Sequence, residues 1–475
     1  MPSQSDIEHL LRRTEYVARD ARVAELQGPA TREQCVDDIL STLADPGTCL
    51  FVQTQNWQQG TELVHYWLDR MAHDSPRPIQ EKMSFFWHGH FVSSMDKVGS
   101  AELMREQIDL YRHGGLGNLR HIAITMATQV AMLRYLDNNE NKKASPNQNF
   151  ARELMELFML GVGNYTEADV EAATAAWTGH GDDWETDTYV WRIGRHDSSV
   201  KSYLGQTINN GGDPTKHGEE TIHVMLGAGV VPADASVVAN RGRPTRDVCA
   251  EFVSKKLWAE FAGTPIPPDV LTALRQVALA NDFAIKPWLK ALLMRDEFYT
   301  TAVKQGRVRT PVEFMVSLLV ATGLRSADAT PLWLMEGMGQ APLYPPNVSG
   351  WKHNSYWISA SAFGQRVSAA RQIMWCTMRD YWNENDLGVI RLGGGSISKL
   401  QIEGTSPWHQ PSDTAQAAAN VAARREILTL MANYMQLDLS PTSRQSLDAL
   451  ATDSEWWELN DLVGLLFLTP EMQVA

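Results

Sequence analysis

Apolar residues recur at intervals of three and four along most of the chain, which is the pattern of amphipathic helices. The segment "DIEHLLRRTEYVARDARVAEL" places Ile7, Leu10, Leu11 and Tyr16 on one helical face. The same pattern predicts later helices in residues 245–262, 267–282, 285–297, 310–323, 358–382, 414–436 and 455–468. A chain built from so many helices is expected to fold as a large, mainly α multi-helix orthogonal bundle.

Three segments depart from this helical pattern. Residues 184–207 are rich in Thr, Tyr, Val and Trp and nearly alternate in polarity, which predicts one short β-hairpin excursion. In "LYPPNVSGW" (343–351), consecutive prolines force extended backbone. The glycine-rich segment 391–399 has no phosphate-binding spacing and is expected to be a flexible connection. We expect two helical halves, 1–240 and 241–475, in one compact unit.

Charge and composition restrict the classes of partner. Lys and Arg total 42 against 56 Asp and Glu, so the formal charge is −14, which argues against nucleic acid or an anionic membrane. No stretch has the roughly 18 uncharged apolar residues of a membrane-spanning helix, and the first residues lack the order of a signal peptide. The four cysteines contain no CxxC pair, which favours reduced thiols. Cytoplasmic location is therefore the expectation.

The stretch "MSFFWHGHF" (83–91) places two histidines, His88 and His90, in aromatic and apolar surroundings. Residues two apart on an α-helix point about 200° away from each other, so on a helix they could not bind one metal ion. Gly89 between them permits a bend, and HxH on extended or kinked backbone is a spacing of metal ligands. Buried structural histidines and a metal site both remain open at this point.

A second stretch, residues 136–158, combines an Asn-rich loop with a helix. Asn149, Arg152, Glu153 and Glu156 form one polar stripe, while most of the remaining circumference is apolar. The stripe could be an ordinary solvated face with an Arg152–Glu156 pair. If it is buried, its carboxylates must be paired or bind a metal.

A third stretch, "GRHDSSVKSYLGQT", contains His196, Asp197 and Lys201 in the non-helical excursion. Functional residues often gather in such loops, although a His-Asp pair also suits a simple Asx-turn. The chain has neither GxSxG nor HExxH, which disfavours the hydrolases that carry those motifs.

These stretches resemble the bacterial "domain of unknown function 1800" family. The resemblance rests on "HLLRRTEY", "EKMSFFWHGHFVSS", "AMLRYLDNNENKKASPNQNFARELMELFMLGVGNYTEADV", "HDSSVKSYLGQT", "FVSKKLWAEF", "RTPVEF" and "LYPPNVSGWKHNSYW", in the family's order. The family has no settled activity, so the resemblance implies a fold and a set of candidate positions. Members often carry an export signal and accompany a sulfatase-like partner; this sequence lacks that signal.

The leading hypothesis is a metal-dependent enzyme, with an oxidoreductase or oxygenase preferred, that acts on a small anionic or peptide substrate. Imidazole and carboxylate ligands suit iron, manganese, copper or zinc. The expected ligands are His88, His90, Glu153, Glu156 and His196. Arg152 or Lys201 would bind the anionic group of the substrate, and Asp197 would orient a histidine.

Two alternatives remain. The chain could be a non-catalytic helical scaffold that binds a partner protein, with a buried polar network that only specifies packing. It could also be a magnesium-dependent isoprenoid diphosphate cyclase using Asp137, Asn141, Asn149 and Glu153, although DDxxD is absent. The metal hypothesis requires its imidazole and carboxylate groups to meet around one point.

Overall fold

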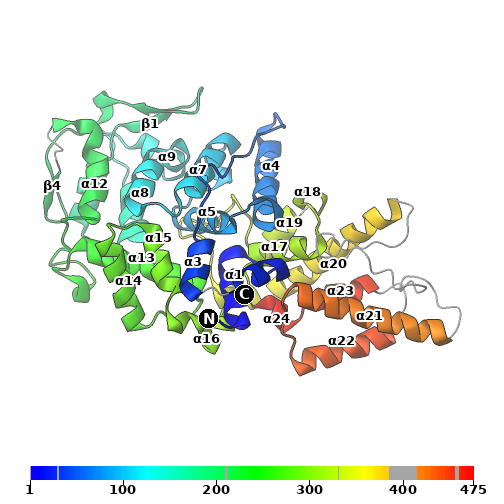
Figure 1. Cartoon of the computed structure of the whole chain (residues 1–475). Helices are drawn as coiled ribbons and strands as arrows, with labels where there is room; N and C mark the ends of the chain where they lie inside the picture. Colours follow the sequence, from blue (N-terminus) through cyan, green and yellow to red (C-terminus); the bar gives the residue numbers. More distant parts are fainter. Residues whose placement is uncertain are drawn as a thin grey trace.

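The computed structural model describes residues 2–28, 31–208, 212–329, 331–383, 414–454 and 459–474. Within them the chain is mainly α-helical, as the sequence predicted, and it contains two short antiparallel hairpins (Figure 1). The predicted connection 391–399 and the start of the predicted helix 455–468 lie outside the described residues. No helix in the described ranges is both long and apolar enough to cross a membrane.

The first half of the chain forms short and medium helices around α5. They are α1 (Gln4–Glu15), α2 (Asp20–Leu26), α3 (Arg32–Ile39), α4 (Asn56–Asp69), α5 (Pro78–His90), α6 (Met95–Val98), α7 (Ala101–Gly114), α8 (Leu119–Thr128), α9 (Val130–Tyr135), α10 (Asn149–Glu153), α11 (Glu167–Ala176) and α12 (His217–Met225).

The second half continues with further helices, only some of which were predicted. They are α13 (Thr245–Phe261), α14 (Pro268–Ala280), α15 (Ile285–Leu293), α16 (Thr301–Lys304), α17 (Pro311–Thr322), α18 (Ser326–Ala329), α19 (Leu332–Met338), α20 (Ala360–Asn383), α21 (Thr414–Tyr434), α22 (Pro441–Asp453), α23 (Leu459–Leu466) and α24 (Pro470–Gln473). Of these, α13, α14, α15, α17, α20, α21 and α23 match the predicted ranges to within a few residues where both are described, while the others were not predicted.

The non-helical excursion contains two hairpins rather than the single one expected over 184–207. β1 (His180–Asp183) pairs with β2 (Thr188–Trp191), and β3 (Lys201–Tyr203) pairs with β4 (Gln206–Ile208). The two pairs are separate because a short 3₁₀ turn and the Asp197–Ser199 turn interrupt the chain between them. In Figure 1 the β3–β4 hairpin lies at the left edge beside α12, and the β1–β2 hairpin lies at the top left near α9.

Helix α5 lies at the centre of the fold and packs against α1 and α7 (Figure 1). Pro78 begins it at a position where the missing N–H is not needed. Every residue of α5 except Gly89 is buried, which is why its last turns, Phe85 to His90, carry aromatic side chains in several directions. The "HGH" residues therefore lie at the end of the most enclosed helix.

The predicted local signals of the Asn-rich stretch are present. Thr166 and Asp169 form a capping box at the start of α11, and Gly161 has a positive φ of 84° after the preceding helix. Before Gly161 the helix widens: α10 continues into the π-helical segment η3 (Leu154–Met159). A π-turn pairs residues five apart and commonly marks functional sites.

Candidate functional site

Because α5 is helical through His90, the two histidines of "HGH" point in different directions. His88 lies against the rings of Trp67 and Trp351, at centroid distances of 5.6 and 5.4 Å. Its Nε2 accepts a hydrogen bond from the backbone N–H of Leu343 at 3.3 Å. His88 therefore fixes the turn that precedes the "PPNVSGW" loop.

The same loop approaches the backbone of α5 closely at Gly350. A Cβ on Gly350, whose φ is 75°, would lie 2.3 Å from the backbone oxygen of Gly89, so this position requires glycine. A Cβ on Gly89 would meet the Trp351 ring at 3.5 Å, an ordinary packing distance. Gly89 lies within the helix and does not provide a bend that unites the two imidazoles.

His90 lies on the other side of α5 and borders a cavity. Its Nε2 donates to the backbone oxygen of Phe158 at 2.9 Å, so its Nδ1 carries the lone pair. That Nδ1 is buried and has no hydrogen-bond partner among the described residues. Burial and the nearby Lys256 lower the pKa of His90 well below its ordinary value, so the ring is neutral.

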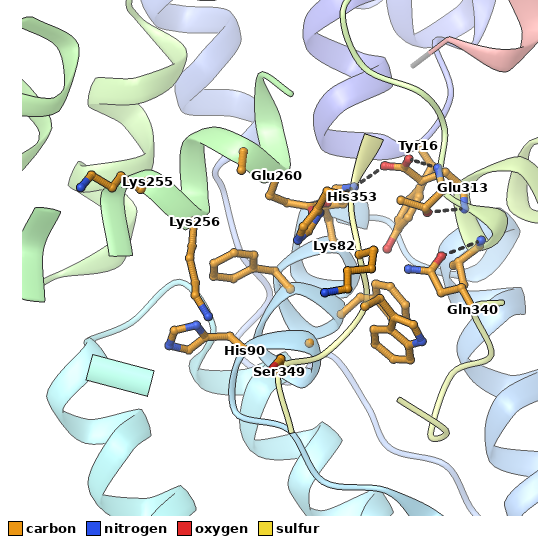
Figure 2. A pocket seen from close by; sticks show the side chains of 18 of the residues that line it. Tyr16, Lys82, His90, Lys255, Lys256, Glu260, Glu313, Gln340, Ser349 and His353 are labelled. Atoms are coloured by element: carbon orange, nitrogen blue, oxygen red, sulfur yellow. Dashed lines mark hydrogen bonds and ion pairs between the residues drawn. The ribbon is translucent and has the colours of Figure 1, made fainter. Parts of the chain in front are cut away.

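Lys256 reaches the same place from α13. Its Nζ donates to the backbone oxygen of Leu157 at 3.0 Å and lies 5.0 Å from the centre of the Phe252 ring. Leu157 and Phe158 belong to η3, so the π-helical turn supplies adjacent carbonyl oxygens to Lys256 and His90. Figure 2 shows the amine of Lys256 directed toward the His90 ring.

Lys256 has no carboxylate within ion-pair distance in the described part of the chain. A partly buried ammonium without a counter-charge loses part of its hydration, and burial lowers the pKa of Lys256 to about 8. Lys256 was not among the residues predicted from the sequence. The available signal was the spacing of Phe252, Lys256 and Glu260, which places all three on one face of α13.

The cavity beside these residues has a volume of about 440 Å³, within the range of small-molecule sites. Its walls are aromatic, formed by Phe85, Phe86, Phe252 and Trp351, and Trp351 stacks on Phe85 at 5.1 Å. Polar residues complete the lining: Lys82, Lys255, Lys256, Glu260, Glu313, Gln340, Ser349 and His353. Figure 2 shows most of them around the space, while the amine of Lys255 is directed away from it.

One end of the cavity is a closed ion-pair network. Lys82 on α5 contacts Glu260 of α13 at 2.7 Å and Glu313 of α17 at 2.5 Å. Arg307 contacts the same two carboxylates at 3.1 and 2.7 Å. Burial alone would raise the pKa of Glu313, but Arg307 and Lys82 hold it well below its ordinary value. The four charges balance, so this end of the cavity is neutral overall.

The polar stripe of the Asn-rich motif lies elsewhere and is only partly buried. Arg152 pairs with Glu167 at 2.8 Å instead of with Glu156, whose carboxylate accepts a hydrogen bond from Tyr165. Glu153 is half-buried, and burial and Glu156 raise its pKa. None of these three predicted residues lines the cavity that contains His90.

His196, Asp197 and Lys201 form a separate cluster beside α12. His196 Nε2 lies 3.0 Å from His217 Nδ1, and its Nδ1 lies 2.7 Å from the Thr178 backbone oxygen. Lys201 Nζ donates to the backbone oxygens of Asp197 and Ser199, both at 2.6 Å. The lysine therefore closes a turn instead of facing a substrate.

The common metal centre expected from the sequence is not formed by these residues. His88, His90, the Glu153–Glu156 stripe and His196 occupy four different environments. In the described ranges, no three His, Cys, Asp or Glu side chains are arranged to hold one metal ion. The residues do not fit the expected group, because a helix directs His88 and His90 apart.

The side chains proposed as magnesium ligands also form hydrogen bonds and an ion pair within the fold. Asn141 donates to Asn138 and to the Thr174 backbone oxygen and accepts from the N–H of Asn147. Asp137 pairs with Lys97 at 2.8 Å. The Asn-rich loop therefore anchors the end of α11.

Fold and cavity together define a mainly α-helical protein with an aromatic, lysine-bordered cavity between α5, α13 and the "PPNVSGW" loop. The chain belongs to the family described as "Protein of unknown function (DUF1800)", whose model matches residues 9–474. Comparison with curated proteins and with solved structures gave no significant match.

Proposed function

We propose that the cavity binds a small organic anion with an apolar, preferably aromatic, body. The observation that carries this proposal is the concentration of unpaired lysines around an aromatic cavity in a chain of net charge −14. Lys255, Lys256 and Lys352 line it and have no ion-pair partner among the described residues. The carboxylates Glu260 and Glu313 are already neutralised by Lys82 and Arg307.

The cavity has aromatic walls and lysines at its rim, and this arrangement supports the same kind of ligand. Aromatic rings provide most of the wall and favour burial of an apolar body. Lys255 and Lys352 are exposed at the rim, where they can contact a carboxylate, sulfonate or phosphate group. The four cysteines are buried, and buried thiols agree with a reducing compartment, so we retain the cytoplasm as the proposed location.

The experiment is a calorimetric titration with naphthoate and with its neutral amide, naphthamide. The two probes share shape and aromatic surface, so their difference measures the contribution of the lysines. We expect saturable binding of naphthoate and much weaker binding of naphthamide. A double variant, Lys255→Met with Lys352→Met, is expected to weaken naphthoate about tenfold, or about 1.4 kcal/mol.

The matched control is Lys143→Met with Lys286→Met, which removes two exposed lysines that do not line the cavity. This control should bind naphthoate as the wild type does. Equal binding of the acid and the amide, or no saturable binding of naphthoate, naphthalene sulfonate and naphthyl phosphate alike, would contradict the proposal.

A further inference from the structure

Lys256 differs from the exposed rim lysines because it is partly buried and its amine is held by the fold. Its Nζ donates to the Leu157 backbone oxygen, and the ring of Phe252 covers one side. A carbonyl oxygen can accept a hydrogen bond from either an amine or an ammonium, whereas a carboxylate would favour the charged form more strongly. The neutral amine is the nucleophilic form of lysine, and a desolvated site favours it.

His90 adds a second polar group at the same point. Since its Nε2–H is committed to Phe158, the Nδ1 lone pair is free to accept a hydrogen bond beside Lys256. The imidazole is 3 % exposed, so bulk water does not compete strongly for that lone pair. An amine and a hydrogen-bond acceptor are therefore fixed by two consecutive carbonyls of η3.

We propose that Lys256 forms an imine with a carbonyl carbon of the anion bound in this cavity. The neutral Nζ attacks the carbonyl carbon, a C–N bond forms, and one amine proton transfers from nitrogen to the carbonyl oxygen to give a carbinolamine. His90 Nδ1 accepts a hydrogen bond from the carbinolamine hydroxyl and positions it. The second amine proton then transfers to this hydroxyl as the C–O bond breaks, and water leaves. Both amine protons and the carbonyl oxygen depart in that water, so no oxidant or reductant is needed.

The ligand class follows from the two ends of the site. The rim lysines contact the anionic group, the aromatic walls hold the body, and Lys256 requires an aldehyde or ketone. An α-keto acid or aldehyde acid with an aryl group combines these features. This inference rests on the proposed anion binding and adds the covalent step.

The test uses phenylpyruvate as the carbonyl probe and phenyllactate, its alcohol analogue, as the non-reactive probe. Full-length protein is incubated with phenylpyruvate and sodium cyanoborohydride, and the product is mapped by peptide mass spectrometry. We expect Lys256 to gain the mass of the probe less one oxygen atom. The exposed Lys286 in the same sample should stay largely unmodified.

The pH dependence gives a further readout. Trapping at Lys256 is expected to rise with pH and level off above about 8, where its amine becomes neutral. Lys256→Arg should abolish the adduct, and Lys286→Met should leave it unchanged. The wild-type peptide map remains decisive if Lys256→Arg fails to fold.

The two proposals fail differently. If phenyllactate and phenylpyruvate bind alike and no adduct forms at Lys256, the imine is excluded while anion binding stands. If modification is spread over exposed lysines at similar rates, the special role of Lys256 is also excluded. If neither acid binds, the proposed function itself fails.

Discussion

Burial keeps both imidazoles of the "HGH" motif neutral, and each one is fixed by a backbone group from a distant segment. His88 accepts from Leu343, and His90 donates to Phe158. The two rings therefore carry their proton on different nitrogens. Two histidines that look equivalent in the sequence have opposite hydrogen-bonding roles.

The neutral state of His88 makes stability depend on pH. Its pKa is lowered by burial from 6.5 to about 3, so between these values the unfolded chain binds a proton that the folded chain does not. Stability is therefore lost as pH falls from about 6.5 toward 3. At pH 5 the loss from this one group is about 2 kcal/mol relative to pH 7.

His88→Gln removes this titration and keeps an acceptor for Leu343. We expect lower stability at pH 7 and a free energy of unfolding that falls less between pH 7 and pH 5, by about 2 kcal/mol. Denaturant unfolding at the two pH values measures the difference. The control is His121→Gln, at an exposed position, which should leave the pH dependence unchanged. If the unfolding free energy of His88→Gln falls between pH 7 and pH 5 as much as that of the wild type, His88 does not cause this pH dependence.

Among the elements, the helices were predictable and the widened turn was not. Apolar spacing located α13, α17 and α20 because that spacing depends only on which face is buried. The same spacing does not distinguish an α-turn from the π-turn of η3, yet this turn provides the carbonyls that hold Lys256 and His90. The sequence pattern therefore identified this segment, but its predicted residues Arg152, Glu153 and Glu156 lie on a face that does not line the cavity.

The contact between α5 and the "PPNVSGW" loop can be tested at Gly350. An alanine there has an unfavourable positive φ and a Cβ 2.3 Å from the Gly89 oxygen, a backbone atom that cannot yield without moving the helix. We expect Gly350→Ala to lower the free energy of unfolding by roughly 2–5 kcal/mol. Because Ser349 and Trp351 line the cavity, naphthoate binding should weaken as well.

Gly205 is the matched control, since its φ is 74° but a Cβ there would meet nothing within 4 Å. Gly205→Ala isolates the backbone strain and is expected to cost roughly 1–2 kcal/mol, with no change in naphthoate affinity. If the two variants are equally stable and bind naphthoate equally well, the close packing of the loop does not shape the cavity.

At the scale of the whole molecule, the sequence could not say which polar residues share a site. Glu153 and His90 both lie in motifs that place polar residues among apolar ones. In the structure Glu153 is only half-buried, whereas His90 is buried. Lys256 was passed over because an isolated lysine in a helix usually extends into water. Only the assembled packing of α5, α13 and η3 encloses its amine.

The ion-pair network is the polar connection between α5, α13 and α17, so it tests how far the cavity depends on the assembly. Glu313→Gln keeps the shape and the Thr310 cap but leaves Lys82 and Arg307 with one carboxylate. An uncompensated buried charge should lower the free energy of unfolding by about 3–5 kcal/mol.

The control is Asp296→Asn, which breaks the pair with Arg32. The Asp296 side chain is 92 % exposed in this pair, so its loss should lower the free energy of unfolding by less than about 1 kcal/mol. Urea unfolding at pH 7 compares them. Similar losses of unfolding free energy in both variants would mean that the network is as well solvated as a surface ion pair. The end of the cavity that this network forms would then be open to water.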